Sequence, residues 1–457
     1  MKSSDYPFSY LVSDYFIGGI KILTVLGISM VVIFTYLIMS KRLSPVTALT
    51  IVPVVFAIIG GFSSKLGDMM LDGIKVVAPS AALLLFAILF FGILIDAGLF
   101  DPLIKTMLKI VKGDPVKIAI GTALIAMTVA LDGDGTTTHM ITISAMLPLY
   151  LRLGMNPLTL ATISMLSVSI MSGMTPWGGP STRAIASLGL DANEFFVPII
   201  PTLIAGMGSI LYTAYVLGKK ERKMLGVVHF NAAPDLKIAF GEAAVASAIQ
   251  DDIKRPKLIW VNLLLTIIIM TVLVVGIIPA PVLFLIGFVL AAAINYPNLE
   301  QQRERVASHA RNSITVVILV FAAGIFSGIF SGTKMVDAVA NSLVAIIPES
   351  LGSFFPTVVA LTSMPLTFVL SNDAYYFGVL PILAEAGAAY GVSPLEIARA
   401  SVLGQPVHFL SPLVASTLLL VGMVKTDIGD LQRYAFKWAL FCSLVMIIIA
   451  VLTGAIT

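Results

Sequence analysis

Three aspartates occur in stretches of sequence that are otherwise apolar. Asp132 and Asp134 belong to the motif Leu131–Thr138, which reads LDGDGTTT, and Asp373 belongs to Ser371–Gly378, which reads SNDAYYFG. A carboxylate in a hydrocarbon environment costs about 2.5 to 3.5 kcal/mol on insertion scales. Each carboxylate must therefore be protonated, paired or bound to a cation, unless the first motif is an exposed turn in which Asp and Thr cap a helix.

Groups that can bind an anion accompany the aspartates. Glycines let a backbone approach closely, and hydroxyls together with the free amides at the start of a half-helix offer hydrogen-bond donors. The candidate binding residues of the two motifs are Gly133, Gly135, Thr136, Thr137, Thr138, Ser371, Asn372, Tyr375 and Tyr376. The candidates for a proton or a metal cation are Asp132, Asp134 and Asp373. Because Asp134 and Asp373 occupy matching places in the two motifs, we expect these two in particular to exchange protons or hold the cation.

Prolines interrupt two further apolar runs, at 174–183 (MTPWGGPSTR) and 404–412 (GQPVHFLSP). Unwound backbone there exposes carbonyls that suit a cation and amides that suit a carboxylate. Arg183 either clamps a carboxylate bidentately or anchors the chain at the outer surface. His408 either exchanges protons, since an imidazole titrates at about pH 6.5, or only hydrogen-bonds a neighbour. The candidate residues of these breaks are Trp177, Gly178, Gly179, Ser181, Arg183, His408 and Ser411.

The composition places these groups in a membrane protein. Of the 457 residues, 58% are hydrophobic and only 12% are charged, and the mean hydropathy is +1.01, which contradicts a water-exposed surface. A net charge of +3 leaves no basic face for nucleic acid. The single cysteine, Cys442, can form neither an internal disulfide nor a thiolate metal site. We therefore expect the lipid bilayer as surroundings, no nucleic-acid partner and no resident cofactor.

Spanning helices need about 20 largely apolar residues each. Ten runs satisfy this length, at 18–39, 46–63, 78–100, 157–188, 196–217, 258–277, 280–296, 313–331, 394–421 and 434–456. Two more apolar stretches, 117–150 and 354–390, are broken in the middle by the aspartate motifs. Each is expected to form a re-entrant helical hairpin. A transmembrane barrel is excluded because its strands would alternate over about ten residues.

The chain carries an internal repeat. Six residues of the first half, Gly154, Pro157, Leu158, Ala161, Ser164 and Leu166, recur at identical spacing as Gly391, Pro394, Leu395, Ala398, Ser401 and Leu403. Each copy has five spans, an odd number, so the second copy enters the membrane from the opposite side. Inverted repeats with interrupted segments at matching positions are typical of secondary transporters and of their binding sites. The sequence thus predicts an all-α polytopic membrane protein built from an inverted repeat.

The repeat divides the chain into ordered blocks. These are an N-terminal segment 1–17; a first repeat 18–217 with three spans over 18–100, a hairpin 117–150, a broken span 157–188 and a span 196–217; a linker 218–257; and a second repeat 258–457 with three spans over 258–331, a hairpin 354–390, a broken span 394–421 and a span 434–456. Most of the 28 lysines and arginines, including those of the linker, fall on one side of this map. By the positive-inside rule that side is cytoplasmic, and both termini are expected outside.

The aspartate motifs resemble the signatures of the citrate–metal–proton symporter family, CitMHS, as do Pro176–Gly179 (PWGG) and Gln405–His408 (QPVH). The resemblance extends from about residue 20 to the end. It implies a homodimeric, elevator-type carrier of the cell membrane that imports citrate in complex with a divalent cation, Mg or Ca, by proton symport. The three-span blocks 18–100 and 258–331 would form its scaffold, and the hairpins with the broken spans would move.

Two alternatives stay open from the sequence. Related sodium-coupled di- and tricarboxylate carriers have Ser-Asn-Thr at both tips, whereas this chain has Asp-Gly-Asp-Gly and Ser-Asn-Asp. Carboxylates can bind a hard divalent cation or a proton, so protons are favoured over sodium. The second alternative takes Asp132-Gly133-Asp134 as the metal-binding motif of an intramembrane transferase, but such an enzyme has no need of an inverted duplicate.

The expected orientation can be tested by labelling. In a Cys442→Ala background, a cysteine placed at Lys223, beside the basic linker, should react with a membrane-impermeant maleimide only after the cells are permeabilised. Reaction from outside in intact cells would reverse the orientation.

Overall fold

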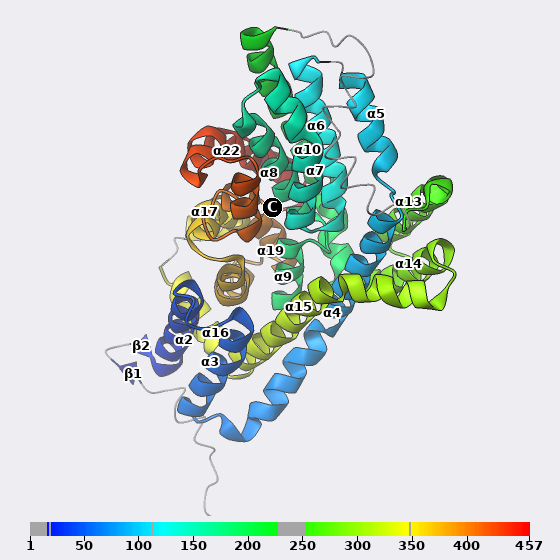
Figure 1. Ribbon diagram of the computed structural model, residues 1–457. Coiled ribbons are helices and arrows are strands. Elements are labelled where there is room, and N and C mark those ends of the chain that lie inside the picture. Colours follow the sequence, from blue (N-terminus) through cyan, green and yellow to red (C-terminus); the bar gives the residue numbers. More distant parts are fainter. Residues whose placement is uncertain (1–15, 18–19, 112, 227–252, 347–348) are drawn as a thin grey trace, which may run out of the picture.

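The computed structural model describes residues 16–17, 20–111, 113–226, 253–346 and 349–457, and it is almost entirely helical (Figure 1). Most of the expected N-terminal segment 1–17 and of the expected linker 218–257 lie outside the described residues. A two-residue strand, β1 (Phe16–Ile17), pairs with β2 (Ile20–Lys21) directly before the first long helix. The helical class predicted from the sequence is confirmed.

The first half consists of α2 (Ile22–Met39), α3 (Pro45–Ile59), η1 (Ser63–Lys65), α4 (Leu66–Asp96), α5 (Asp101–Val111), α6 (Pro115–Val129), η2 (Ala130–Asp132), α7 (Gly135–Leu153), α8 (Pro157–Met174), α9 (Gly179–Leu188) and α10 (Ala192–Leu225). The second half consists of η3 (Pro256–Leu258), α13 (Ile259–Val275), α14 (Ala280–Asn295), α15 (Leu299–Gly332), α16 (Met335–Val344), η4 (Glu349–Phe354), α17 (Phe355–Val369), the π-helical turn η5 (Ala374–Val379), α18 (Leu380–Ala388), α19 (Pro394–Val402), α20 (Gln405–His408), α21 (Ala415–Met423) and α22 (Ile428–Leu452).

Within the described part of the chain, nine helical segments are long and apolar enough to cross a bilayer. Two of them, Pro115–Asp132 and Gly352–Val369, are the first arms of the expected hairpins, and the others coincide with expected spans. The runs 46–63 and 280–296 form α3 and α14, which have 15 and 16 residues. The run 394–421 is divided into α19, α20 and α21. The protein is thus a multi-pass membrane protein.

Helices α4 and α15 begin more than ten residues before the positions that hydropathy indicated. Helix α4 begins at Leu66 rather than near residue 78, and α15 begins at Leu299 rather than near residue 313. The added turns contain charged and amphipathic residues such as Asp68, Asp72 and Arg303. A hydropathy window detects only the apolar part of a helix, so it misses turns that continue beyond that part.

Helices α4 and α15 pack against each other along much of their length, and Figure 1 shows them as two long rods that cross. Glycines allow the close approach. A Cβ added to Gly73 would lie 1.9 Å from the carbonyl oxygen of Gly324, and one added to Gly328 would lie 2.2 Å from the carbonyl oxygen of Met69. Small residues four apart are the usual means by which membrane helices bring their backbones together. The contact joins the two halves of the chain.

A buried arginine stabilises a second junction. Pro198 lies inside α10 and has no N–H, so the carbonyl of Glu194, four residues earlier, loses its helical donor. The guanidinium of Arg399, in α19, donates to that carbonyl at 2.6 Å and also to the carbonyls of Phe195 and Ala455, both at 3.2 Å. Arg399 therefore ties α10, α19 and the C-terminal end together. It is 7% exposed.

The glycine contact predicts a specific loss of stability. Gly73→Ala should lower the midpoint of thermal unfolding, corresponding to about 1 to 3 kcal/mol for overpacking, because the new methyl group meets a backbone carbonyl that cannot rotate away. Gly67→Ala is the matched control, since it is in the same helix and a Cβ there meets nothing within 4 Å. Equal midpoints for the two variants, measured in detergent by intrinsic fluorescence, would contradict the close crossing.

Candidate functional site

The first aspartate motif forms the turn between α6 and α7. Gly133 has φ +82°, a left-handed conformation that favours glycine, and it reverses the chain after η2. Asp134 then caps the N-terminus of α7: its carboxylate accepts the N–H groups of Thr136 and Thr137 at 3.0 Å and the Thr137 hydroxyl at 2.6 Å. Capping by an aspartate satisfies amides that have no partner within the helix. The capping alternative considered for this motif thus describes Asp134, although the turn itself is only partly exposed.

Asp132 has a different environment from Asp134. Its side chain is buried, with 8% of the residue exposed, and its carboxylate accepts the N–H of Asp134 at 2.8 Å. No ion pair among the described residues includes Asp132. Of the two carboxylates in the turn, Asp132 is therefore the one with the fewer stabilising contacts.

Side chains of the broken helix hold this turn. The indole N–H of Trp177 donates to the carbonyl of Leu131 at 2.7 Å, and the hydroxyl of Ser172 donates to the carbonyl of Gly133 at 2.8 Å. There is little room at Gly133, because an added Cβ would lie 3.1 Å from the Trp177 carbonyl oxygen. The first hairpin tip and the first break thus form one structural unit.

The break between α8 and α9 is stabilised by contacts among its own residues. Thr175 is extended, and Gly178 passes so close to the Ser172 carbonyl that an added Cβ would lie 1.8 Å from its oxygen. The hydroxyl of Ser181 donates to the carbonyl of Gly173 at 2.6 Å. Helix α9 starts at Gly179. Ser181 and Gly178 therefore shape the break, and Gly179 begins the half-helix that follows it.

The second aspartate motif lies between α17 and α18. Helix α17 ends at Val369, Ser371 accepts the N–H of Ala374 at 3.2 Å, and the chain continues as the π-helical turn η5. Tyr375 and Tyr376 are fully buried, with their rings edge to face at 5.1 Å. π-helical turns are rare and frequently occur at functional sites.

An ion pair connects the two halves at this turn. Nε of Arg183, in α9, lies 2.7 Å from Oδ1 of Asp373, and one terminal nitrogen of the same guanidinium donates to the Gly179 carbonyl at 2.9 Å. The two side chains are 21% and 15% exposed. Arg183 is therefore directed into the region between the hairpin and the break, and it does not lie on the outer surface.

Gln405, which was not among the residues expected to bind a ligand, joins the second tip to the second break. Its side-chain amide donates to the Tyr376 hydroxyl at 2.9 Å and to Asn372 Oδ1 at 3.3 Å. The side-chain carbonyl oxygen of Gln405, Oε1, is buried and accepts no hydrogen bond from the described residues. A polar residue directly before Pro406 was the signal that could have identified it. On its other side Gln405 packs against α8, because a Cβ added to Gly173 would lie 3.3 Å from the Cβ of Gln405.

Two further candidate residues of the second break, His408 and Ser411, make hydrogen bonds to nearby backbone groups. His408 is 3% exposed and pairs with the carbonyl of Thr367, and the buried hydroxyl of Ser411 accepts the N–H of Leu413 at 3.3 Å. The first tip also approaches the second broken helix. A Cβ added to Gly135 of α7 would lie 3.0 Å from the hydroxyl oxygen of Ser416 in α21. Thr136 is exposed, and Thr138 bonds the Asp134 carbonyl within the same turn.

The described residues contain no group of three or more His, Cys, Asp or Glu side chains that could hold a metal ion. Asp132, Asp134 and Asp373 thus do not converge as a three-carboxylate site. A cation bound here would need oxygen ligands from another source as well, such as backbone carbonyls or a bound anion.

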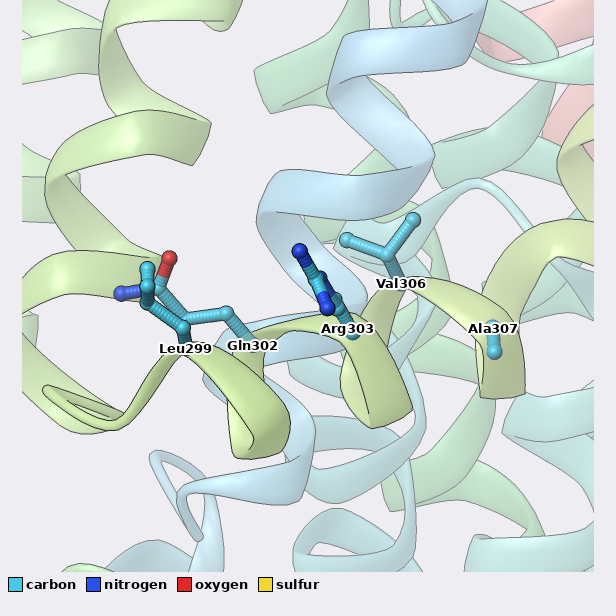
Figure 2. Close-up of a pocket in the computed structure, with 5 residues that line it drawn as sticks. All are labelled: Leu299, Gln302, Arg303, Val306 and Ala307. Atoms are coloured by element: carbon cyan, nitrogen blue, oxygen red, sulfur yellow. The ribbon is translucent and has the colours of Figure 1, made fainter.

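A surface hollow on α15 lies outside this arrangement. Figure 2 shows that its lining residues, Leu299, Gln302, Arg303, Val306 and Ala307, follow one face of a single helix. No residue of either hairpin tip or break lines it. The hollow therefore contributes nothing to the candidate site.

Known proteins similar to this chain are transporters. The sequence model of the CitMHS family, described as citrate transporter, matches residues 23–404. Three relatives from Bacillus subtilis (strain 168) align with 95% of this chain: an uncharacterized transporter, YraO, at 62% identity over 99% of its length; a citrate transporter at 56% over 100%; and a Mg(2+)/citrate complex secondary transporter at 53% over 99%.

Two solved structures resemble the fold. The MtrF protein of Neisseria gonorrhoeae is similar with a TM-score of 0.56 at 12% identity, covering 96% of each chain. The YdaH transporter of Alcanivorax borkumensis is similar with a TM-score of 0.51 at 14% identity, covering 94% of this chain and 98% of its own. At these identities the likeness concerns the arrangement of helices alone.

Proposed function

The chain belongs to the CitMHS citrate transporter family, and from this premise we propose that it imports citrate as a complex with a divalent cation, by symport with protons. The family and the relatives are transporters and not enzymes. The alternative of an intramembrane transferase is therefore set aside.

The charges of the site support the metal complex as substrate. Asp132, Asp134 and Asp373 contribute up to three negative charges, and Arg183 contributes one positive charge. A trivalent citrate entering alone would meet like charges in a medium of low dielectric constant. A divalent cation removes two of its charges. One relative is named a Mg(2+)/citrate complex secondary transporter, and this name agrees with the reasoning from charge.

The backbone offers the matching ligands. Half-helices α7 and α9 begin beside the first tip and the first break, and their N-terminal amides suit carboxylates. Carbonyls where the helices break suit a hard cation. We propose that Gly133, Gly135, the threonines 136–138, Gly178, Gly179, Ser371 and Asn372 contact the substrate, and that Trp177, Tyr375, Tyr376, His408 and Ser411 keep the two tips and breaks in position.

The order of elements supports an inverted repeat. In each half a pair of helices is followed by one long helix, a short helix, a hairpin, a broken helix and a closing helix, so that α4, α5 and α10 correspond to α15, α16 and α22. We propose that the copies are inverted, that helices α2–α4 and α13–α15 form the scaffold of a homodimer, and that the hairpins with the broken helices move through the membrane as a unit. The cell membrane, with both termini outside, is the proposed location.

The proton is assigned by elimination among the three carboxylates. Asp373 is paired with Arg183, and Asp134 is satisfied by two amides and a hydroxyl. Asp132 is buried, forms no ion pair among the described residues and accepts a hydrogen bond only from the N–H of Asp134. A carboxylate in such a place needs a proton or a cation. We propose that Asp132 exchanges the symported proton, while Asp134 maintains the turn and Asp373 faces the substrate.

The substrate form predicts how uptake responds to metal. In proteoliposomes with an inward proton gradient, uptake of labelled citrate should follow the concentration of the Mg or Ca complex and not that of total citrate. It should fall to background in excess EDTA. Uptake that persists in EDTA and requires sodium would instead identify a sodium-coupled di- or tricarboxylate carrier.

The proton assignment predicts a selective defect. Asp132→Asn keeps an acceptor for the Asp134 N–H but cannot bind a proton as a carboxylate does. Uptake driven by a proton gradient should fall at least about tenfold, equivalent to 1.4 kcal/mol, whereas exchange of internal for external substrate should continue. Asp72→Asn, at an exposed aspartate of α4, should leave both rates unchanged. A normal gradient-driven rate in Asp132→Asn would contradict the assignment.

A further inference from the structure

We propose that the Arg183–Asp373 ion pair is a selectivity lock that accepts the metal–citrate complex and rejects citrate or the metal cation alone. The inference rests on the proposed function and adds the residues that enforce it. It begins from a contact between the two halves of the chain, at the point where the first break meets the second hairpin tip.

The pair leaves binding capacity unused on both sides. A guanidinium has five N–H donors, and the described contacts of Arg183 use Nε and one terminal nitrogen. Asp373 accepts through Oδ1 alone, so its second oxygen has no donor among the described residues. The contact is thus a single hydrogen bond through Nε rather than the paired, bidentate form that Arg and carboxylate can adopt. A better-matched ligand for each partner can displace it.

The pair is also shielded enough for an unpaired charge to matter. The two side chains are 21% and 15% exposed, and the nearest turns of the second tip, with Tyr375 and Tyr376, are fully buried. If one member of a shielded ion pair takes a new partner, the other is left without compensation, which is unfavourable. Any ligand that separates the pair must therefore supply charge of both signs.

Each component alone fails this requirement. Free citrate can engage Arg183, but it places further carboxylates beside an Asp373 that has just lost its partner. A bare divalent cation can engage Asp373, but it leaves Arg183 unpaired and adds positive charge beside it. In both cases the separated ion pair opposes binding.

The complex satisfies both partners at once. A divalent cation held by citrate keeps coordination positions for further oxygen ligands, and an oxygen of Asp373 can occupy one. A citrate carboxylate can accept two N–H bonds from Arg183, whose planar fork fits that geometry. The ligand thus replaces one ion pair by two contacts of opposite sign, and the net charge of the two side chains stays at zero throughout.

The local backbone is suited to this exchange. Gly179 starts α9 and its carbonyl holds the guanidinium one helical turn before Arg183, so the arginine keeps its place when Asp373 departs. Asp373 directly precedes η5, where i→i+5 bonding replaces the α-helical pattern. The aspartate lies on the less regular of the two elements, and we infer that it is the partner that moves.

The test compares binding to purified variants in nanodiscs by isothermal titration calorimetry. Wild-type protein should bind citrate in excess Mg and show at least tenfold weaker binding of citrate in EDTA. Asp373→Asn frees Arg183, so its affinity for citrate in EDTA should rise at least about tenfold over wild type while its preference for the complex disappears. Arg183→Gln frees Asp373, so binding of Mn alone, detected by electron paramagnetic resonance, should become measurable and exceed that of wild type.

Control variants separate the lock from general effects. Asp430 and Arg433 form an exposed Arg–Asp pair in α22, at 3.2 Å, so Asp430→Asn and Arg433→Gln should keep the wild-type preference. Asp373→Glu retains the charge and should retain selectivity for the complex. A preference for the complex that is the same in Asp373→Asn and Asp373→Glu would overturn the lock. Wild-type protein that binds citrate equally with and without Mg would instead overturn the proposed substrate form.

Discussion

The constraint on which the structure depends is that a helix broken inside an apolar protein must have its freed carbonyls and amides satisfied locally. An unpaired backbone group there costs far more than in water. At the first break the side chains of Ser172 and Trp177 donate to the carbonyls of Gly133 and Leu131, respectively, and Ser181 donates to the carbonyl of Gly173. The first two bonds cross from the broken helix to the hairpin tip, so satisfying the backbone also determines where the turn lies.

The same constraint determines the roles of several charged residues. Asp134 satisfies amides at the start of α7, and Arg399 satisfies the carbonyl that Pro198 leaves free in α10. These two charges are used to stabilise helix ends. Three other charged side chains near the tips do not stabilise helix ends in this way. Asp373 and Arg183 form an ion pair with each other, and Asp132 accepts one hydrogen bond, from the N–H of Asp134. Polar residues in an apolar chain thus divide into those that complete the backbone and those left free for a ligand.

The long helices have a contrasting role. Helices α4 and α15 meet through Gly73, Gly324 and Gly328, where the backbones of the two helices lie in close contact. Such a contact permits little adjustment, because any added atom collides with a carbonyl. The tips, in contrast, are held to the neighbouring helices by side-chain hydrogen bonds and by one ion pair with a single hydrogen bond. A rigid crossing beside a site with exchangeable contacts is compatible with the movement that we propose for the hairpins.

The sequence by itself determined the class of molecule and the positions of its irregular segments. Hydropathy identified the membrane protein, the motifs around Asp134, Pro176, Asp373 and Pro406 identified the family, and the structure interrupts its helices at those motifs. These features are local: apolar length, prolines and glycines act on the few residues around them. Helix ends such as Leu66 and Leu299 were missed because polar helical turns leave no hydropathy signal.

Only the tertiary structure decided which polar residues meet. The sequence placed Arg183 and Asp373 in separate motifs, 190 positions apart, and left the arginine with two roles. It treated Asp134 and Asp373 as equivalent, yet one caps a helix and the other forms an ion pair. It did not select Gln405, whose partners Asn372 and Tyr376 lie on another helix. Pairings of this kind depend on how distant helices pack, and packing is set by the whole set of contacts rather than by any short stretch of residues.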